Sequence, residues 1–360
     1  MMYLSSLRLK NFRNIKETEI QFNPRVNIIL GQNGQGKTNL LEAIYFLGIA
    51  RSFRTSQDST LITWDGDGFF LSGVVAKQHI QDKIDVLLEG TKRVRINSKF
   101  LPRIIDLIGH LLVSVFFPED LHLIKGTPDL RRRFLDILLS QSNPQYLYHL
   151  QQYQKILKQR NEMLWQLKIG MNDMPVDMLS VWDTQMQSAA SQIVEAREEA
   201  IRNIEGIASG IHQQIIIANE TFKMSYKPSI FTPDKRSNEI RRGCTLSGPH
   251  LDDILFQING VDARHGSSQG QQRTAAISLR LAEMECLYQQ TEELPVLLLD
   301  DVCSELDESR RGYLMKAINR GGQIFITTTE LDTVKELIDG ATVFEVKEGG
   351  IACNSSSAFS

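Results

Sequence analysis

The sequence lacks an excess of positive charge and a cysteine framework. Its 360 residues hold 40 lysines and arginines against 43 acidic residues, so the net charge is −3 and the overall basic balance of many nucleic-acid-binding proteins is missing. Any nucleic-acid-binding surface must therefore be local. The four cysteines, at positions 244, 286, 303 and 353, do not have the spacing of a metal site, and they fit a reducing compartment.

Long apolar runs are also missing. No run approaches the roughly 18–20 residues that span a bilayer, and the first residues do not have the pattern of a signal peptide. The seven histidines are scattered without metal-ligand spacing. We therefore expect a cytoplasmic protein without a membrane span, long enough for one large or two moderate domains.

The clearest feature that is present is a glycine-rich loop. An apolar strand is expected at 26–30 and a helix at 40–47, and the residues between them match G-x-x-x-x-G-K-T, the phosphate-binding loop in its proper context. Backbone N–H groups of such a loop point at phosphate oxygens, Lys37 would reach the β- and γ-phosphates, and the Thr38 hydroxyl would hold Mg²⁺. The predicted nucleotide-binding residues are Gly31, Gln32, Asn33, Gly34, Gln35, Gly36, Lys37, Thr38 and Asn39.

Asp300 and Asp301 follow a second apolar run, at 295–299, that is typical of a central strand buried on both faces. Phosphate-loop enzymes hold Mg²⁺ with a carboxylate at the end of such a strand, usually through water, and we predict this role for Asp300. Asp301 is predicted to polarise the attacking water as a general base, which makes it a candidate catalytic residue together with Lys37. The alternative is a pair of acids that only cap a helix.

Ser268, Gly270 and Gln271 form the motif S-x-G-Q directly before a helix expected at 275–287. A serine, a glycine and a helix N-terminus can together bind an anion. The motif alone is weak, because a simple helix cap would give the same residues. Its place ahead of the Asp300 strand favours a second nucleotide-binding element.

The character of the chain changes twice. Residues 1–117 contain mostly strand patterns around the phosphate loop, and a meander within 69–96 suggests a mixed sheet. Residues 118–242 contain two long helical patterns, broken once at Arg160, that predict a short antiparallel hairpin of about three heptads per helix. Residues 243–360 return to strands. We predict an α/β phosphate-loop ATPase head, in two parts, with a helical arm between them.

This order of motifs resembles the ATP-binding-cassette ATPases, down to Ser304-Glu305-Leu306-Asp307 after the carboxylate strand. The resemblance implies a head-to-tail dimer with two ATP molecules at its interface, each held by one subunit's phosphate loop and the other's S-x-G-Q. Ser268 and Gly270 would then contact the γ-phosphate in trans, and Asp307 would cross the interface.

A closer resemblance, over nearly the whole chain, is to the RecF family of bacterial DNA replication and repair proteins. It implies an ATP-dependent DNA-binding protein of recombinational gap repair, a weak DNA-stimulated ATPase that acts with RecO and RecR to help load RecA at gapped DNA. The motifs that carry it, beside those above, are N-F-R-N at 11–14, R-S-F-R at 51–54, P-E-D at 118–120, R-R-R-F-L-D at 131–136 and G-P-H at 248–250.

Three features depart from these families. Leu251 follows Gly-Pro-His where a basic residue is usual. Asp301 is one methylene shorter than the glutamate of most cassettes, which is consistent with slow hydrolysis. The threonines at 327–329 replace the switch histidine of transporter cassettes. The alternatives are the nucleotide-binding subunit of a transporter, and a chromosome-organising ATPase of the SMC kind, which would need far longer helices.

Local basic clusters are the candidate DNA contacts. Three consecutive arginines at 131–133 fan around a helix, so a solvated face with internal salt bridges is an equal alternative. Alternation places Arg93 and Arg95 on one strand face, which could follow a phosphate backbone without reading bases. Arg51 and Arg54 could serve either DNA or ATP. The candidate DNA-binding residues are Arg51, Arg54, Arg93, Arg95, Arg131, Arg132 and Arg133.

Overall fold

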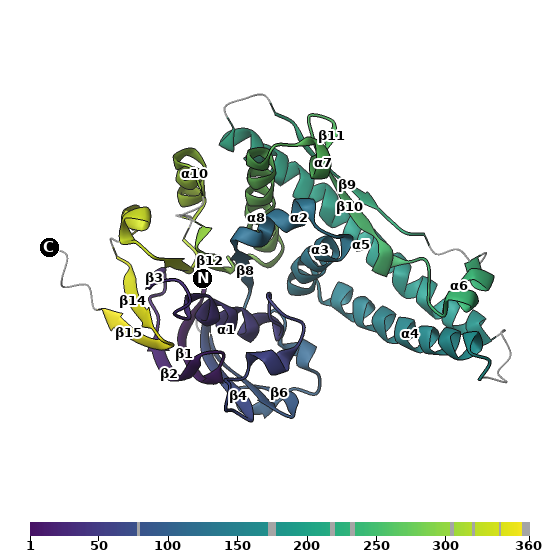
Figure 1. Ribbon diagram of the computed structural model, residues 1–360, viewed down its shortest axis with the longest axis horizontal. Coiled ribbons are helices and arrows are strands. Elements are labelled where there is room, and N and C mark those ends of the chain that lie inside the picture. Colours follow the sequence, from purple (N-terminus) through teal and green to yellow (C-terminus); the bar gives the residue numbers. More distant parts are fainter. Residues whose placement is uncertain are drawn as a thin grey trace. The chain divides into compact units, whose positions relative to one another are not determined.

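The computed structural model describes residues 1–77, 80–171, 178–216, 220–230, 235–302, 306–318, 321–337 and 340–354. The chain divides into two compact units, a first of Met1–Asp120 with Leu279–Ser360 and a second of Leu121–Ser278 (Figure 1). We call them the head and the arm. None of the helices in the described part of the chain is long and apolar enough to cross a membrane.

The head contains a six-stranded sheet that carries the phosphate loop. Its order is β15-β14-β3-β13-β12-β8, and all neighbours are parallel except β14 and β15. Every residue of β12 and β13 is buried, as expected for central strands covered on both faces. The strands are β3 (Val26–Leu30), β8 (Val113–Phe116), β12 (Val296–Asp300), β13 (Ile324–Thr328), β14 (Thr342–Lys347) and β15 (Gly350–Asn354).

A second, antiparallel sheet of the head contains the meander. The mixed sheet predicted from the sequence is confirmed, but the meander is not part of it: the mixing comes from β15, which a two-residue turn with positive φ at Glu348 and Gly349 folds back on β14. The order of the second sheet is β2-β1-β4-β5-β6-β7. Its strands are β1 (Met2–Phe12), β2 (Ile15–Gln21), β4 (Gly68–Lys77), β5 (Ile80–Glu89), β6 (Thr91–Ile96) and β7 (Lys99–Phe100).

Helix α1 (Lys37–Ile49) joins the two sheets of the head. It contacts β8 and β12 of one sheet and β1 and β4 of the other. From Leu40 to Ile49 all of its residues are buried, which is the pattern of a helix surrounded by core rather than of a surface helix. The phosphate loop therefore begins on a central strand and ends in the most buried helix of this core.

The arm is a helical hairpin with a small sheet. Helix α4 (Pro144–Lys168) packs against α5 (Met178–Ile215), and α5 is longer than the predicted three heptads because its buried face continues through Ala208 and His212 onto β9. The sheet has the order β11-β10-β9. The remaining elements are α2 (Leu121–Lys125), α3 (Pro128–Ser142), β9 (Phe222–Lys227), α6 (Arg236–Arg242), β10 (Asp253–Ile258), β11 (Val261–Asp262) and α7 (Ala263–Gly266).

The contacts place residues 243–278 with the arm, whereas the sequence prediction placed them with the head. The reason is that β10 pairs along its length with β9 and that α3 packs on β10. The boundary at 278/279 falls inside α8 (Gln269–Thr291). The other predicted boundary, 117/118, lies close to the observed 120/121.

Buried arginines explain why the hairpin pattern breaks at Arg160. This side chain is 1% exposed, and it makes ion pairs with Asp183 on α5 at 2.9 Å and with Glu239 on α6 at 2.6 Å. Arg197 on α5, also 1% exposed, pairs in the same way with Asp136 and Asp252, at 2.8 Å each. The break in the apolar stripe is thus an ionic contact between elements of the arm.

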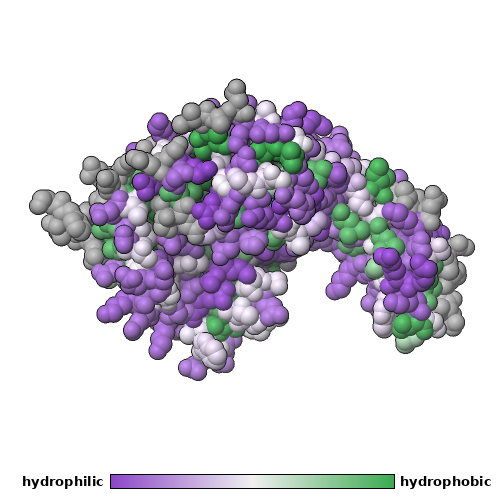
Figure 2. Space-filling view, turned by 45° about the horizontal axis from the view of Figure 1, so that its top comes forward, coloured by the Kyte–Doolittle hydropathy of each residue, from purple (hydrophilic) through white to green (hydrophobic). Residues whose placement is uncertain are grey.

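The closed end of the hairpin exposes apolar side chains. Figure 2 shows green, hydrophobic residues at this end of the arm, where α4 finishes and α5 begins. Of the arm methionines, Met163 and Met186 are buried in the core, whereas Met171 and Met178 at this end are exposed. The exposed residues are Trp165, Ile169, Met171, Met178 and Val181.

Candidate functional site

The phosphate loop leaves β3 at Gly31 and enters α1 at Lys37. Gly34 and Gly36 have φ of 81° and 115°, which only glycine adopts without strain. A side chain at Gly31 would meet the carbonyl oxygen of Val346 at 2.5 Å. The glycines are therefore required by the path of the backbone, and the strand, turn and helix that were predicted around them are present.

Neighbouring turns hold the loop from outside. The Asn14 side chain donates to the carbonyl of Gln35 at 3.0 Å and accepts from the Asn39 amide at 2.8 Å. The turn after β14 adds two bonds, from the N–H of Gly349 to the Gln35 carbonyl at 2.9 Å and from the N–H of Glu348 to the Gln35 side chain at 2.7 Å. Sequence reasoning did not assign Asn14 this role; its signal is the N-F-R-N turn.

Thr38 and Asp300 meet although they are far apart in the sequence. The Thr38 hydroxyl lies 2.8 Å and 3.0 Å from the two carboxylate oxygens of Asp300. Thr327 donates to the same carboxylate at 2.8 Å and accepts the N–H of Asp301 at 2.8 Å. The Thr327 hydroxyl is therefore engaged in positioning the two carboxylate residues, a role that the sequence did not reveal.

The charges of this site are compensated differently from ordinary ion pairs. Burial raises the pKa of Asp300, while the hydroxyls of Thr38 and Thr327 act in the opposite direction. Burial lowers the pKa of Lys37, whose ammonium donates to the carbonyls of Gly31 at 2.6 Å and Gln32 at 3.2 Å. Within the described ranges, neither Lys37 nor Asp300 forms an ion pair within 4.0 Å.

This donor set fits a magnesium ion that is shared with a nucleotide. Carboxylate and hydroxyl oxygens are the ligands that Mg²⁺ prefers, and protein sites for it commonly supply one or two of them, the rest being waters and phosphate oxygens. No group of three or more histidine, cysteine or acidic residues that could hold a metal occurs in the part of the chain that the structure describes. The residues that would hold the ion are Thr38 and Asp300.

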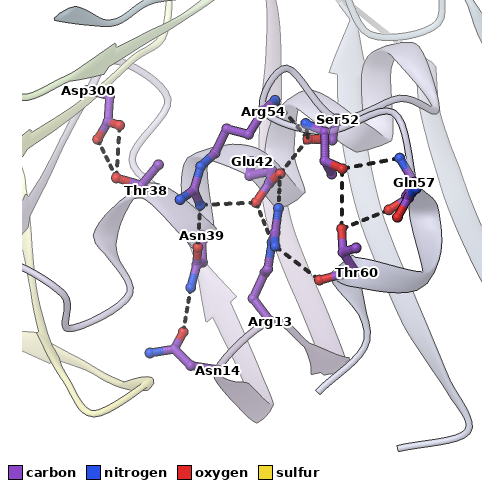
Figure 3. Close-up of polar contacts among 11 residues, drawn as sticks. Arg13, Asn14, Thr38, Asn39, Glu42, Ser52, Arg54, Gln57, Thr60 and Asp300 are labelled. Atoms are coloured by element: carbon purple, nitrogen blue, oxygen red, sulfur yellow. Dashed lines mark hydrogen bonds and ion pairs between the residues drawn. The ribbon is translucent and has the colours of Figure 1, made fainter. Parts of the chain in front are cut away.

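Glu42 forms the centre of a polar network behind the loop (Figure 3). Its carboxylate is fully buried in α1 and accepts two bonds from Arg13, at 2.8 Å and 2.9 Å, and one from Ser52 at 2.5 Å. Arg54 lies 3.5 Å from the same carboxylate and donates to the side chain of Asn39 at 2.9 Å. The network fixes Arg54 beside the phosphate-loop helix, which favours a role toward the nucleotide. Arg51 is exposed.

The S-x-G-Q motif caps α8 within the arm. The Ser268 N–H donates to the Gln271 side chain at 2.8 Å, and the Gln271 N–H donates back to the Ser268 hydroxyl at 3.2 Å. The amide of Gln271 then donates to Glu220 at 2.8 Å. Ser268, Gly270 and Gln271 thus stand at a helix N-terminus, where an anion is favoured; their contact with a nucleotide stays a prediction.

Asp307 stands at the start of α10 (Glu308–Ile318). It accepts the N–H of Arg310 at 2.9 Å and forms an ion pair with the guanidinium of the same residue, and its side chain is half exposed. Ser304 and Glu305 of the same motif lie outside the described residues. That Asp307 crosses a dimer interface remains a prediction.

The arginines at 131–133 divide by burial. Arg131 is 1% exposed and pairs with Asp253 at 2.7 Å, so it is withdrawn from the candidate DNA contacts: its charge is buried inside the arm. Arg132 donates to the Asp252 carbonyl at 2.6 Å. Arg133 also has an interaction partner. Asp136, on the same helix, pairs with Arg197.

Arg93 and Arg95 share a face of β6, as predicted, and an aromatic ring lies with them. Their guanidinium carbons are 5.8 Å and 4.4 Å from the centre of the Phe100 ring, on the edge strand β7, and that ring is 52% exposed. The sequence analysis did not associate an aromatic residue with these two arginines. It missed Phe100 because the contact forms across the β6–β7 hairpin.

The Gly-Pro-His motif is built into the arm. The Pro249 carbonyl accepts a bond from buried Arg197 at 2.7 Å, and His250 lies 2.6 Å from the hydroxyl of Tyr153. Burial lowers the pKa of His250. A side chain at Gly248, whose φ is 121°, would meet the Tyr153 hydroxyl at 2.4 Å. These contacts account for the motif without a ligand.

Comparisons with known proteins agree with this geometry. Residues 3–351 match the family model described as the RecF/RecN/SMC N terminal domain. The chain is 42% identical over 369 residues to the DNA replication and repair protein RecF of Halalkalibacterium halodurans, with 97% of this chain and 99% of the relative covered. Identity to RecF of Listeria monocytogenes is 40% over 369 residues, with the same coverage.

Solved structures give the same result. The chain matches a structure of the recombination mediator protein RecF with ATP, described as part of the RecFOR pathway, with a TM-score of 0.89, 34% identity and 98% of both chains covered. It also matches the Smc head domain of Pyrococcus furiosus bound to the C-terminal domain of ScpA, with a TM-score of 0.56 and 15% identity over 99% of this chain and 97% of that one, which shows the head fold alone.

Proposed function

This chain belongs to the RecF family of DNA replication and repair proteins, and from that premise we propose that it is an ATP-dependent DNA-binding protein in which ATP closes two copies into a dimer. The observation that carries the proposal is the pairing of Thr38 with Asp300, which joins the phosphate loop to the carboxylate strand. A transporter subunit, the alternative left by the sequence, does not fit this family.

ATP with Mg²⁺ would bind at the loop, and the chain's own residues indicate how. Lys37 donates to two loop carbonyls, and it would exchange them for the β- and γ-phosphate oxygens. Thr38 and Asp300 supply oxygen ligands to a magnesium ion, whose chemistry is to neutralise phosphate charge. Asp301, whose backbone is fixed by Thr327, would accept a proton from the attacking water.

The second half of the site would come from another copy. In the dimer that the cassette resemblance implies, Ser268 and Gly270 at the N-terminus of α8 contact the γ-phosphate, with Gln271 beside them and Asp307 near the partner. The fixed Ser268–Gln271 cap supports this role, because its N–H groups and hydroxyl are already oriented before any anion arrives. Hydrolysis would be slow, and its rate would set how long the closed dimer persists.

DNA would bind to local basic surface in a sequence-independent and salt-sensitive manner. Arg93 and Arg95 around Phe100 are the contacts that we favour, with Arg51, Arg132 and Arg133 as further candidates. As the family resemblance implies, the ATP-closed dimer would work with RecO and RecR to help load RecA at gapped DNA in the cytoplasm.

Two substitutions test the composite site. Ser268→Arg is expected to abolish ATP-dependent dimerisation, measured by light scattering, and to leave ATP binding by the monomer unchanged. A collapse of monomer affinity would instead mean that S-x-G-Q acts within one copy. Asp301→Asn is expected to keep ATP binding and slow turnover; unchanged turnover would remove Asp301 as the base.

A further inference from the structure

Glu220 connects the S-x-G-Q motif to the end of the long arm helix. Its carboxylate accepts the side-chain N–H of Gln271 at 2.8 Å, and its other oxygen lies 3.4 Å from Nε2 of His212 on α5. The Glu220 side chain is 16% exposed and that of His212 is fully buried. The motif is thus bonded to a residue that lies beyond the C-terminal end of α5, far away in the sequence.

Glu220 lies beside a stack of buried aromatic rings. The His212 ring stacks on Phe222 of β9 with a centroid distance of 5.3 Å, and Phe222 stacks on Phe256 of β10 at 6.1 Å. These rings are buried in the arm core. The Glu220 carboxylate therefore packs beside a buried ring on one side and accepts the bond from Gln271 on the other.

The bonds of Gln271 show what its contact with Glu220 achieves. Its side-chain oxygen accepts the Ser268 N–H, and its side-chain nitrogen donates to Glu220, so one amide bridges the serine and the arm. The Ser268 oxygen accepts the Gln271 N–H, which leaves the hydroxyl hydrogen to donate to an anion. Loss of the Glu220 contact would let the amide rotate and would release the cap at Ser268.

We propose that Glu220 is a positioning residue for the S-x-G-Q motif, holding Gln271 and through it Ser268 in the orientation that receives the γ-phosphate of ATP on a second copy of the chain. This inference rests on the proposed composite site. It adds a series of contacts from α5 through Glu220 to the S-x-G-Q motif. A structural change in the arm would alter dimer closure through these contacts, without any change at the phosphate loop.

The test compares Glu220→Ala with Glu220→Gln in the full chain. Alanine removes the acceptor of Gln271, and we expect ATP-dependent dimerisation, measured by sedimentation, to need about ten-fold more protein, the effect of losing a hydrogen bond to a charged group. Glutamine keeps an acceptor oxygen and should restore most of the dimer. ATP binding by the monomer should stay unchanged in both. Glu199→Ala, at an exposed position on α5, is the control.

A second readout needs neither ATP nor a dimer. Amide hydrogen exchange at Ser268 and Gln271 should become faster in the Glu220→Ala monomer and not in the Glu199→Ala monomer. Unchanged exchange would overturn the inference, and so would faster exchange with an unaltered dimer. A wild-type chain that fails to dimerise with ATP would instead overturn the proposed function.

If alanine destabilises the arm, a more conservative substitution of Glu220 still tests the proposal. Glu220→Asp keeps the charge that faces His212 and shortens the reach to Gln271 by one methylene. It should accelerate exchange at Ser268 and weaken the dimer, and wild-type behaviour of this variant in both measurements would refute the role. In a double-mutant cycle, Glu220→Ala should add no further loss to Gln271→Ala, because both break the same link.

Discussion

The buried arginines of the arm and the buried charges beside the phosphate loop are satisfied in opposite ways. In the arm, Arg160 and Arg197 each contact two carboxylates within 2.9 Å, so the protein itself supplies every counter-charge. In the head, the buried Lys37 donates to backbone carbonyls and the buried Asp300 accepts from hydroxyls. Both head groups have a pKa shifted toward the neutral form.

The difference separates structural charge from functional charge. A buried ion pair that is complete has nothing to offer a ligand, whereas a buried charge that is satisfied only by neutral dipoles can still gain from a charged ligand. By this criterion the arm arginines hold elements together, and we propose that Lys37 and Asp300 receive an anion and a cation. The predictions that follow test each side of this contrast, beginning with the largest effect.

Breaking an arm pair should be costly. Arg160→Ala leaves Glu239 buried without its counter-charge and leaves Asp183 with Arg236 alone, and we expect the free energy of unfolding of the arm to fall by about 3–5 kcal/mol. Chemical denaturation followed by tryptophan fluorescence measures it, because two of the three tryptophans, Trp165 and Trp182, lie in the arm. Arg241→Ala, at an exposed position on α6, should change stability by less than about 1 kcal/mol. Equal effects of the two variants would contradict the structural role.

Removing Lys37 should cost function and not stability. Because burial lowers its pKa, the folded head disfavours the charged ammonium, and Lys37→Ala should leave the stability of the head unchanged or slightly raised. ATP affinity should fall about a hundred-fold, the scale of one or two charge-assisted hydrogen bonds. Calorimetric titration with ATP and Mg²⁺ gives the affinity, and Lys10→Ala, an exposed lysine of β1, is the control. A destabilised head with ATP affinity intact would reverse the assignment.

Asp300 gives the contrast a pH dependence. Its pKa is raised on folding, so the folded head holds the proton more tightly than the unfolded chain, and stability present below the ordinary pKa of 3.8 is lost as the pH rises through the raised value. Without ATP and Mg²⁺, Asp300→Asn should therefore protect β12 and β13 against amide exchange at neutral pH by about 1 kcal/mol more than wild type. Added ATP and Mg²⁺ should stabilise wild type and not the variant. A variant less stable than wild type at pH 7 would contradict this account.

The smallest effect concerns DNA. Arg93→Ala with Arg95→Ala should weaken DNA binding several-fold in the presence of ATP. The slope of log affinity against log salt concentration should become shallower by about two, because about two phosphate contacts are lost. Fluorescence anisotropy at several salt concentrations measures both quantities. Arg8→Ala, which removes an exposed pair with Glu17 on the same sheet, is the matched control. If the two sets of variants behave alike, DNA does not bind at β6.

Much of the head could be predicted because its signals are local. The strand before Gly31, the helix after Lys37 and the apolar run before Asp300 all follow from periodicity and glycine spacing, and the structure has them. The partners of these residues could not be predicted. Thr327, Asn14 and Glu220 act across sheet neighbours or turns that are distant in the sequence, so no spacing marks them.

Charged residues of the arm show the same limit. Arg131 and Arg160 look like surface or interrupting residues in the sequence, and their burial depends on carboxylates contributed by other elements. A run of arginines therefore could not be divided into buried and exposed members before the fold was known. The family, by contrast, follows from many short motifs in one order, which is why the resemblance found from the sequence was confirmed.

The most direct test of the central claim is the sedimentation of the wild-type chain with ATP and Mg²⁺, beside Lys37→Ala and Ser268→Arg. The composite site predicts a dimer for wild type and monomers for both variants, with ATP still bound by the Ser268→Arg monomer. In a mixture of the two variants, the intact phosphate loop of the Ser268→Arg chain and the intact S-x-G-Q motif of the Lys37→Ala chain should form one complete site. ATP-dependent association should then be restored. A dimer of Lys37→Ala with ATP, or no association in the mixture, would contradict the account.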